Sequence, residues 1–359
     1  MTDDIRLMKG NEALAEAALR AGMDAYFGYP ITPQSEILEY LAVHGSKRGA
    51  VVLQAESELA AINMVYGAAG AGARVMITSS GPGISLMQEC ISYMASAEIP
   101  FLIANVQRGG PGLGTIQPSQ GDYFQATKGG GHGDYRLLVL APSSVQEMAD
   151  FAFLGFRLAE EYRMGAMILT DGALGQMMEK LVLPPDGSLR QTEKPWATTG
   201  KPVSRERNIL TSLFIQPEKM EEVNLKLQAK YRRLHEEVRF ETFGLEDAEI
   251  VLVAFGLCAR ICQKAMEIAR ERGILLGLIR PITLYPFPTA ILAQTALKAE
   301  SFLVVEMNAG QMLEDVELAV RGMKPVYFKG RMGGMLPSPE EVLKEIESLA
   351  SKVAVEVRN

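Results

Sequence analysis

The chain has 359 residues, of which 48% are hydrophobic and 22% charged, and its formal net charge is -7. This length favours two domains, and the acidic balance argues against a general nucleic-acid-binding protein. No apolar run approaches the roughly 18 residues that a membrane-spanning helix needs, so no membrane association is expected. The first residues, MTDDIRLMKG, carry acids where a signal peptide carries bases, which predicts a cytoplasmic protein.

The first half of the chain alternates short apolar runs with helix-like stretches. The runs DAYFGYP, AVVLQA, ARVMITSS, IPFLIANVQ, YRLLVLAP and MGAMILTDG are typical of buried strands. Amphipathic segments such as Asn11–Ala21 and Gln88–Ala97 lie between several of them, and Ser144 with Glu147 predicts a capping box. The pattern predicts a doubly wound, mostly parallel sheet within residues 1–190.

A polar stretch, DGSLRQTEKPWATTGKPVSRER, then interrupts the alternation, and a charged helix is expected from about Pro217 to Val238. We assign residues 191–245 to a linker that wraps over the surface.

The alternation resumes in residues 246–359. EIVLVAFG, ILLGLIRP, SFLVVEMN and PVYFKG are typical of strands, and two of the helical segments between and after them end in glycine. In the last segment Ser338 and Glu341 form a predicted capping box with Pro339 at the first helical position. The fold class is therefore α/β, with two doubly wound, mostly parallel-sheet domains.

Three cysteines are present, at Cys90, Cys258 and Cys262. They are too few for a four-thiolate iron–sulfur site or a structural zinc site, so reduced, buried thiols and no metal site in this chain are expected.

The turns that follow strands are the places where open α/β sheets bind ligands. In the first, GYPITPQSE, Thr32 is expected to cap a helix and Pro33 to lie in its first turn. Gly28 and Pro30 beside them indicate either a tight backbone or a ligand that lies against it.

Two further turns carry polar groups before helices. In LQAESELAA, Glu56 is interpreted as a helix-dipole residue, whereas Glu58 precedes an apolar face and is a candidate to hold or deliver a proton. In TSSGPGISLM, Gly81 and Gly83 flank a proline where a helix begins, which indicates an anion cradle or a tight turn.

Arg108 ends an apolar strand and precedes the glycine-rich loop GGPGLGTIQPSQGDY. A cation in this place grips a carboxylate or phosphate, unless it is an ordinary surface arginine. The next loop, KGGGHGDY, contains Lys128 and His132, of which the histidine is a base or a solvated side chain. GAAGAG ends a helix and is not a dinucleotide motif.

Taken in order, these segments resemble the α subunit of the 2-oxoacid:ferredoxin oxidoreductases, thiamine-diphosphate enzymes that are built from several subunits. GYPITPQSE, ESELAA, TSSGPGISLM and LAPSSVQE match the family's pyrimidine-binding domain, and PFP and VVEMNAGQM match its transketolase-C-terminal-like domain. The loop after Arg108 is most similar to the branched-chain type and departs from the 2-oxoglutarate type.

The resemblance implies a role for each candidate. Glu58 would bond the aminopyrimidine ring, Thr32 would contact the substrate, and Arg108 would face the substrate carboxylate. The other cofactor-binding positions that it implies are Tyr29, Pro30, Gly81 and Gly83.

The resemblance also implies partners. The chain lacks the G-D-G motif through which Mg²⁺ holds the diphosphate, and it lacks cysteines for clusters. A β subunit would therefore hold thiamine diphosphate and Mg²⁺, and partner subunits, including γ and a small ferredoxin-like δ subunit, would carry [4Fe–4S] clusters. Coenzyme A would take the acyl group and ferredoxin the electrons.

The expected substrate is 2-oxoisovalerate, with Leu113 and Ile116 lining a pocket for its isopropyl group. If Lys128 or His132 folds over the site instead, a second carboxylate would be held and 2-oxoglutarate would be preferred. The sequence also permits a carboligase or transketolase-like dehydrogenase half, and a subunit that keeps the fold without chemistry.

Overall fold

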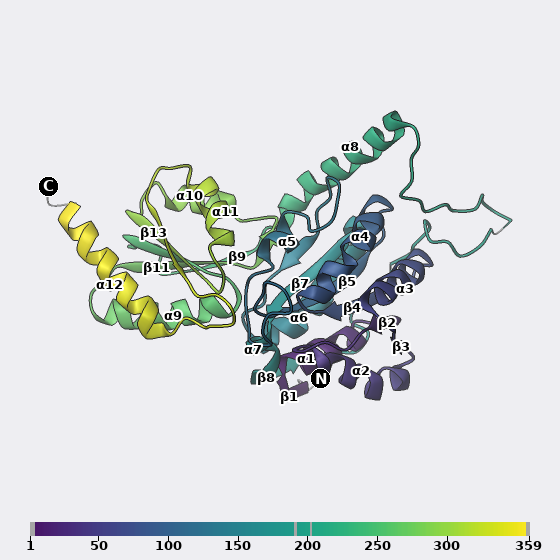
Figure 1. The fold of residues 1–359 in the computed structure, drawn as a ribbon, viewed down its shortest axis with the longest axis horizontal. Helices are drawn as coiled ribbons and strands as arrows, with labels where there is room; N and C mark the ends of the chain where they lie inside the picture. Colours follow the sequence, from purple (N-terminus) through teal and green to yellow (C-terminus); the bar gives the residue numbers. More distant parts are fainter. Residues whose placement is uncertain (1–3, 190–191, 202, 357–359) are drawn as a thin grey trace.

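The computed structural model describes residues 4–189, 192–201 and 203–356, and it shows two α/β lobes along the long axis of the molecule (Figure 1). One lobe is built on a seven-stranded sheet and the other on a five-stranded sheet, and a separate two-stranded ribbon flanks the first lobe. The predicted fold class is confirmed.

The first sheet has the strand order β12-β6-β7-β5-β4-β2-β3, and it is parallel except for β12. Every residue of β4, β5, β6 and β7 is buried, because these continuous apolar runs have a layer of helices on each face. The strands are β2 (Ala25–Gly28), β3 (Val51–Gln54), β4 (Val75–Ser79), β5 (Phe101–Gln107), β6 (Leu138–Leu140), β7 (Gly165–Asp171) and β12 (Thr283–Tyr285).

Helices cover both faces of this sheet. Val75 and Ile77 of β4 pack toward α3 and α4, whereas Met76 between them packs toward α1, α2 and α6. The helices of this lobe are α1 (Gly10–Arg20), α2 (Ser35–His44), α3 (Glu58–Gly70), α4 (Pro82–Ser96), α5 (Tyr123–Thr127), α6 (Val145–Tyr162) and α7 (Gly172–Gln176), with a 3₁₀ turn at Ser46–Arg48.

Three details of this lobe differ from the sequence predictions. β3 is an edge strand whose side chains are largely exposed, although its apolar run predicts a buried strand. β1 (Asp4–Lys9) and β8 (Met178–Leu183) form an antiparallel ribbon that the sequence pattern does not predict. Ser144 caps α6 by accepting a hydrogen bond from the Glu147 N–H at 3.1 Å, but the Glu147 carboxylate accepts from the N–H of Ser143 and not of Ser144.

The connection between the lobes contacts the first lobe around Trp196 and Thr198, and it then projects away from the lobe before α8 (Figure 1). Thr198 donates its N–H to the carbonyl of Gly70 at 2.9 Å, and the Arg163 guanidinium stacks on the Trp196 ring. α8 (Pro217–Arg233) and a 3₁₀ turn (Leu234–Glu237) then run back to the second lobe. Residues 190, 191 and 202 of the predicted linker lie outside the described residues.

The second sheet has the order β14-β13-β10-β11-β9, and α9 with α12 packs on one face while α10 with α11 packs on the other. Ser338 and Glu341 form the predicted capping box, with bonds of 3.1 and 3.2 Å. The elements are β9 (Phe240–Phe243), β10 (Ile250–Val253), α9 (Gly256–Glu271), β11 (Leu276–Pro281), α10 (Thr289–Thr295), β13 (Ser301–Glu306), α11 (Gln311–Val320), β14 (Val326–Gly330) and α12 (Pro339–Glu356).

The two lobes are interlocked. β12 leaves the second lobe and pairs antiparallel with β6, so that Thr283 faces Leu140 in the first sheet. β9, which falls within the predicted linker, pairs antiparallel with β11. One hydrophobic cluster runs continuously from the first lobe into the second. The loops at the junction are therefore held in a defined relation to one another.

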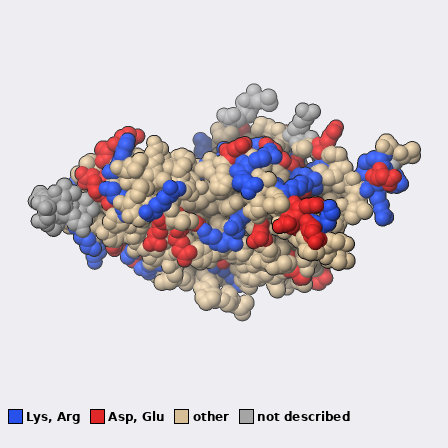
Figure 2. Space-filling view, turned by 90° about the horizontal axis from the view of Figure 1, so that it is seen from above, with Lys and Arg blue, Asp and Glu red and all other residues tan. Residues whose placement is uncertain are grey.

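Two surface properties complete the fold. On the face in Figure 2, basic and acidic side chains are interspersed and are not gathered by sign. Within the described ranges, no helix combines the length and the apolar character that crossing a membrane requires. The three cysteines are free and buried, as predicted.

Candidate active site

The turn after β2 is held by a chain of buried hydrogen bonds. Thr78 donates its hydroxyl to Gln34 Oε1 at 2.6 Å, so the Tyr26 hydroxyl, 2.7 Å from Thr78 Oγ1, must donate to Thr78. Gln34 Nε2 in turn donates to the Tyr29 carbonyl. A Cβ on Gly28 would stand 2.5 Å from the Tyr26 hydroxyl, which explains the glycine at this position.

Thr32 does not cap a helix, contrary to the prediction. α2 begins three residues later at Ser35, with Gln34 at the N-cap position. The physical reason is a tertiary contact: Asn11 Nδ2 of α1 donates to the Pro33 carbonyl at 2.9 Å and to Glu36, which fixes the chain before the helix starts. Thr32 itself is exposed, and its carbonyl accepts from Arg108 Nη1 at 2.9 Å.

The Arg108 guanidinium connects the turn, the glycine-rich loop and the start of α4. Nη1 bonds the Thr32 carbonyl, Nη2 bonds the Leu113 carbonyl at 3.0 Å, and a Cβ on Gly81 would lie 3.8 Å from the Arg108 side chain. Nε is buried without a partner among the described residues. A cleft of about 430 Å³ opens here, lined by Gly81, Pro82, Ser85, Arg108, Gly109, Gly110, Pro111, Gly112, Leu113 and Asp122.

Glu58 is the first residue of α3, and Ser57 caps this helix by accepting from the Ala60 N–H at 3.1 Å. The Glu58 side chain is only 6% exposed. Yet no described residue donates a hydrogen bond to its carboxyl group, which is unusual for a buried acid.

The surroundings of Glu58 are polar and tightly fitted. A Cβ on Gly83 would stand 2.1 Å from Ser79 Oγ and 2.5 Å from Glu58 Oε1, so only glycine leaves room. The hydroxyls of Ser79 and Ser80 are buried and have no partner in the described part of the chain. A buried carboxyl and two unpaired hydroxyls are a donor and acceptor set that a polar heteroaromatic ring fits.

Other predicted residues lie either on the turn after β2 or in the glycine-rich loop. Tyr29 and Pro30 lie exposed on the turn with Thr32. Leu113 is 81% exposed and Ile116 is 58% exposed, and of the two only Leu113 lines the Arg108 cleft.

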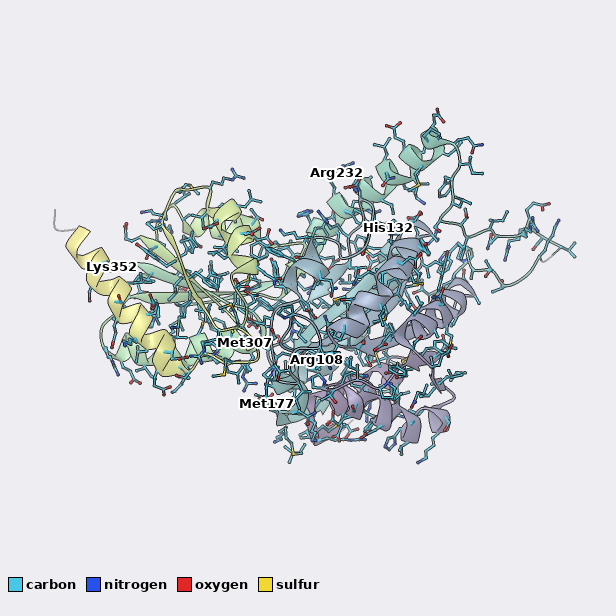
Figure 3. The ribbon with its side chains drawn as sticks, in the orientation of Figure 1. Arg108, His132, Met177, Arg232, Met307 and Lys352 are labelled. Carbon is cyan, nitrogen blue, oxygen red and sulfur yellow. The ribbon has the colours of Figure 1, made fainter. Side chains whose placement is uncertain are left out.

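Lys128 and His132 are not brought to the cleft. Lys128 is paired with Asp315 of α11. His132 accepts on its carbonyl from Ser92 Oγ at 2.6 Å, and its ring meets Tyr93 edge-on. The contacts of His132 lie in the C-terminal half of α4, far from its N-terminal end at the cleft, and Figure 3 shows His132 well separated from Arg108.

Sequence reasoning missed two residues of the glycine-rich loop. The Asp122 carboxylate accepts from Asn105 Nδ2 at 2.9 Å, and burial raises its pKa although that bond and the Arg108 charge lower it. Gln120 is buried and directs all four of its hydrogen-bonding groups into the second lobe: to Phe255, to Asn308 and twice to Met307. In the sequence, the only notable feature here is that Gly121–Tyr123 reads GDY and lacks the last glycine of a G-D-G motif.

No cluster of three or more His, Cys, Asp or Glu side chains with metal-binding geometry occurs within residues 4–189, 192–201 and 203–356.

Two family models match this chain. Residues 16–242 match the model of the pyruvate flavodoxin/ferredoxin oxidoreductase thiamine-diphosphate-binding domain, and residues 248–342 match core domain II of pyruvate:ferredoxin oxidoreductase. The chain belongs to the 2-oxoacid:ferredoxin oxidoreductase family. The family predicted from the sequence motifs is thereby confirmed.

Relatives of this chain are named for two different 2-oxoacids. The ketoisovalerate oxidoreductase subunit VorB of Methanothermobacter thermautotrophicus is 50% identical over 96% of this chain and 98% of its own length. The 2-oxoglutarate synthase subunit KorA of Methanocaldococcus jannaschii is 37% identical over 95% of this chain and 99% of its own length.

Solved structures agree with the fold. The 2-oxoglutarate:ferredoxin oxidoreductase from Magnetococcus marinus, with 2-oxoglutarate, coenzyme A and succinyl-CoA bound, superposes with a TM-score of 0.84 at 27% identity. It covers 97% of this chain, which spans 66% of that longer one. A split-gene transketolase, an inactive β4 tetramer, has a TM-score of 0.61 at 12% identity. This likeness concerns the fold only.

Proposed function

We propose that this chain is the subunit of a coenzyme-A-acylating 2-oxoacid:ferredoxin oxidoreductase that binds the 2-oxoacid, and that its substrate is branched, as 2-oxoisovalerate is. The oxidative decarboxylation would yield an acyl-CoA and pass electrons to ferredoxin. The observation that carries the proposal is Arg108, a cation at a cleft to which neither Lys128 nor His132 is brought. The greater identity to a ketoisovalerate oxidoreductase subunit than to 2-oxoglutarate synthase subunits supports the choice of substrate.

Arg108 has donors left for a carboxylate. A guanidinium carries five N–H groups, and two of them are used on the Thr32 and Leu113 carbonyls. One N–H on each Nη and the unpaired Nε–H remain, which is enough for a two-point grip on the carboxylate of a 2-oxoacid. The bonds to the two carbonyls hold the guanidinium plane before the substrate arrives, so less conformational entropy is lost on binding.

Glu58 is the residue proposed to meet thiamine diphosphate. When bound, this cofactor supplies the nucleophilic carbon that attacks the keto group and the electron sink for decarboxylation. The Glu58 carboxyl would hold a proton at the far nitrogen of the aminopyrimidine ring, and the Ser79 and Ser80 hydroxyls supply unpaired groups nearby. Gly83 keeps the space above the carboxyl open.

A partner subunit is proposed to complete the site. Exposed apolar side chains lie beside the glutamate and around the cleft, at Leu59, Leu86, Leu113 and Ile116. Such a group favours a protein interface over free solvent exposure. The chain has no G-D-G motif, so we assign Mg²⁺ and the diphosphate to a β subunit, and the [4Fe–4S] clusters to further subunits of the γ and δ kind.

This division of labour has a direct test. The isolated chain should bind thiamine diphosphate weakly with or without Mg²⁺, and the complex should bind it tightly with Mg²⁺, as measured by titration calorimetry. Tight Mg²⁺-dependent binding by the isolated chain would contradict the assignment.

The substrate proposal is tested on the assembled complex with a viologen acceptor and coenzyme A. We expect kcat/KM for 2-oxoisovalerate to exceed that for pyruvate by about 10-fold or more, since each buried methylene of the side chain adds to binding. We expect a lower value still for 2-oxoglutarate. A preference for 2-oxoglutarate, the substrate of the second group of relatives, would overturn the branched-chain proposal and would require Lys128 to leave Asp315.

A further inference from the structure

A second cleft lies at the junction of the two lobes and adjoins the Arg108 cleft. It has a volume of about 350 Å³ and is formed by the glycine-rich loop and the segments that follow β13 and β14. Its lining residues are Gly110, Pro111, Ser119, Gly121, Asp122, Met307, Asn308, Ala309, Gln311, Met332 and Gly333. The two clefts share Gly110, Pro111 and Asp122, and Figure 3 shows Arg108 and Met307 at the same junction.

We propose that this interlobe cleft receives the hydrocarbon side chain of the 2-oxoacid whose carboxylate is held by Arg108, and that Met332 is the residue that tunes the preference. The inference rests on the function proposed above. It assigns the choice of substrate to the second lobe, whereas the sequence pattern points to Leu113 and Ile116.

The lining chemistry favours an aliphatic group. Met307, Met332, Ala309 and Pro111 present carbon and thioether sulfur, and methionine adapts readily to the shape of a branched chain. Of the described residues that line the cleft, Asp122 alone is ionisable. A second carboxylate, as in 2-oxoglutarate, would thus meet no cation in the cleft and one group of like charge.

The neutral polar side chains of the lining, Ser119, Asn308 and Gln311, are already hydrogen-bonded within the protein. Ser119 donates its hydroxyl to the Met307 carbonyl at 3.2 Å, and Asn308 donates its amide to the Gln120 carbonyl at 2.8 Å. Gln311 donates to the Gly121 carbonyl and accepts from the Phe124 N–H, each at 2.7 Å. These groups hold the walls together and leave little hydrogen-bonding capacity for a polar substrate group.

The walls are also fixed in relation to Arg108. A Cβ on Gly334 would stand 2.5 Å from Gln117 Cβ, and one on Gly109 would stand 2.8 Å from the Gly333 backbone. The glycine pair after β14 therefore lets the second lobe touch the loop that begins at Arg108. By contrast, Leu113 and Ile116 are 81% and 58% exposed, and neither of them lines the interlobe cleft.

Two methionines of one short segment provide a matched test. Met332 lines the cleft and Met335 does not, although they are 60% and 54% exposed and lie three residues apart. In the assembled complex, Met332→Lys should lower the ratio of kcat/KM for 2-oxoisovalerate to that for 2-oxoglutarate by 10-fold or more. Met335→Lys should change this ratio by less than 2-fold.

A volume change in the same cleft gives a second measurement that does not depend on charge. Ala309 is exposed at the cleft, so Ala309→Leu fills space without disturbing the core. We expect pyruvate to keep its kcat/KM within 3-fold, while 2-oxo-4-methylvalerate, with its longer branch, loses 10-fold or more, chiefly through KM. Equal losses for both substrates would overturn the assignment.

The possible failures are distinguishable. If the wild-type complex turns over 2-oxoisovalerate but Met332→Lys and Met335→Lys behave alike, the cleft assignment is wrong and the proposed function stands. If Leu113→Ala or Ile116→Ala moves the substrate ratio and Met332→Lys does not, the loop is the specificity element and the assignment is likewise wrong. A wild-type complex without turnover of any branched 2-oxoacid overturns the proposed function and this inference with it.

Discussion

The N-terminal ends of α3 and α11 each follow a parallel strand, and each holds a buried glutamate at the positive end of a helix dipole. Glu306, beside α11, accepts from the N–H groups of Met312 and Leu313 at 2.9 and 3.0 Å and from Asn308 Nδ2 at 2.8 Å. Glu58, at α3, accepts none from any described residue. The first carboxyl is fully used in holding its loop, whereas the second is free to bond a ligand.

The neighbours of the two glutamates differ in the same way. Both amide atoms of Asn308 are hydrogen-bonded, but the hydroxyls of Ser79 and Ser80 are buried and unpaired among the described residues. An unpaired buried polar group costs about 1–3 kcal/mol of stability. A fold that keeps two such hydroxyls together at the end of β4 gives up stability there, which is the usual mark of a site that is completed by a bound molecule.

The largest expected effect comes from replacing Glu58 by its amide. The same replacement at Glu306 is the comparison. Glu58→Gln should lower the turnover of the assembled complex by about 100-fold or more, because a carboxamide cannot hold the proton that the pyrimidine nitrogen requires. Glu306→Gln should leave turnover within about 3-fold, because its bonds are made to the protein. Steady-state assays with 2-oxoisovalerate and a viologen measure both.

Glu56→Gln is the matched control, because Glu56 lies two residues away and is exposed. Thermal unfolding of the purified complexes should show that Glu58→Gln is folded. Near-normal activity of Glu58→Gln, or an equal loss in Glu56→Gln, would remove the distinction between the two glutamates.

A somewhat smaller effect is expected from closing the space at Glu58. The Cβ of Gly83→Ala would collide with Ser79 Oγ and Glu58 Oε1, so both side chains must move. Turnover should fall by about 10-fold or more, with a raised KM for thiamine diphosphate. Gly67→Ala in α3, where a Cβ would meet nothing within 4 Å, should instead stabilise the protein by about 0.5–1 kcal/mol with unchanged turnover.

The pH dependence of stability should identify Glu306 as a titrating group at the α11 end. Burial raises the pKa of Glu306 from 4.5 to about 7, so the native state holds this proton more tightly than the unfolded state does. Its contribution to stability is thus complete below about pH 4.5, is lost as the pH rises to about 7, and is constant above that, with a total change of at most about 3 kcal/mol.

In Glu306→Gln this titration is absent, so the fall in stability between pH 5 and pH 8 should be smaller than in the wild type. Urea unfolding at a series of pH values measures the difference. Asp171, whose pKa burial raises to about 6, is present in both proteins and cancels. Parallel curves for the two proteins would show that Glu306 is not the titrating group.

The sequence predicted the central strands well, because buried parallel strands such as β5 and β7 are continuous apolar runs. It also placed Glu58 and Arg108 at strand ends, where open α/β sheets bind ligands. It missed β1, β8, β9 and β12, which are short or half-exposed and pair antiparallel with distant segments. Local pattern carries no signal for such pairings.

Tertiary contacts explain the remaining differences. Thr32 matches the local signature of a helix cap, but Asn11 of α1 holds the Pro33 carbonyl and the helix starts later. The interlobe cleft depends on Gln120 bonding the ends of β10 and β13 and on two glycines that touch the loop across the lobes. None of these contacts has a counterpart in residue spacing along the chain.

The smallest expected effect is on the unpaired hydroxyl beside Glu58. Ser79→Ala removes a buried group that has no partner among the described residues, so the free energy of unfolding should stay the same or rise by up to about 1 kcal/mol. Asn308→Ala at the α11 end removes an amide that makes four hydrogen bonds and should lower it by about 1–3 kcal/mol. Urea unfolding of the two variants compares the ends directly. If Ser79→Ala destabilised the protein as much as Asn308→Ala does, the Ser79 hydroxyl would have a structural partner, and the α3 end would be as saturated as the α11 end.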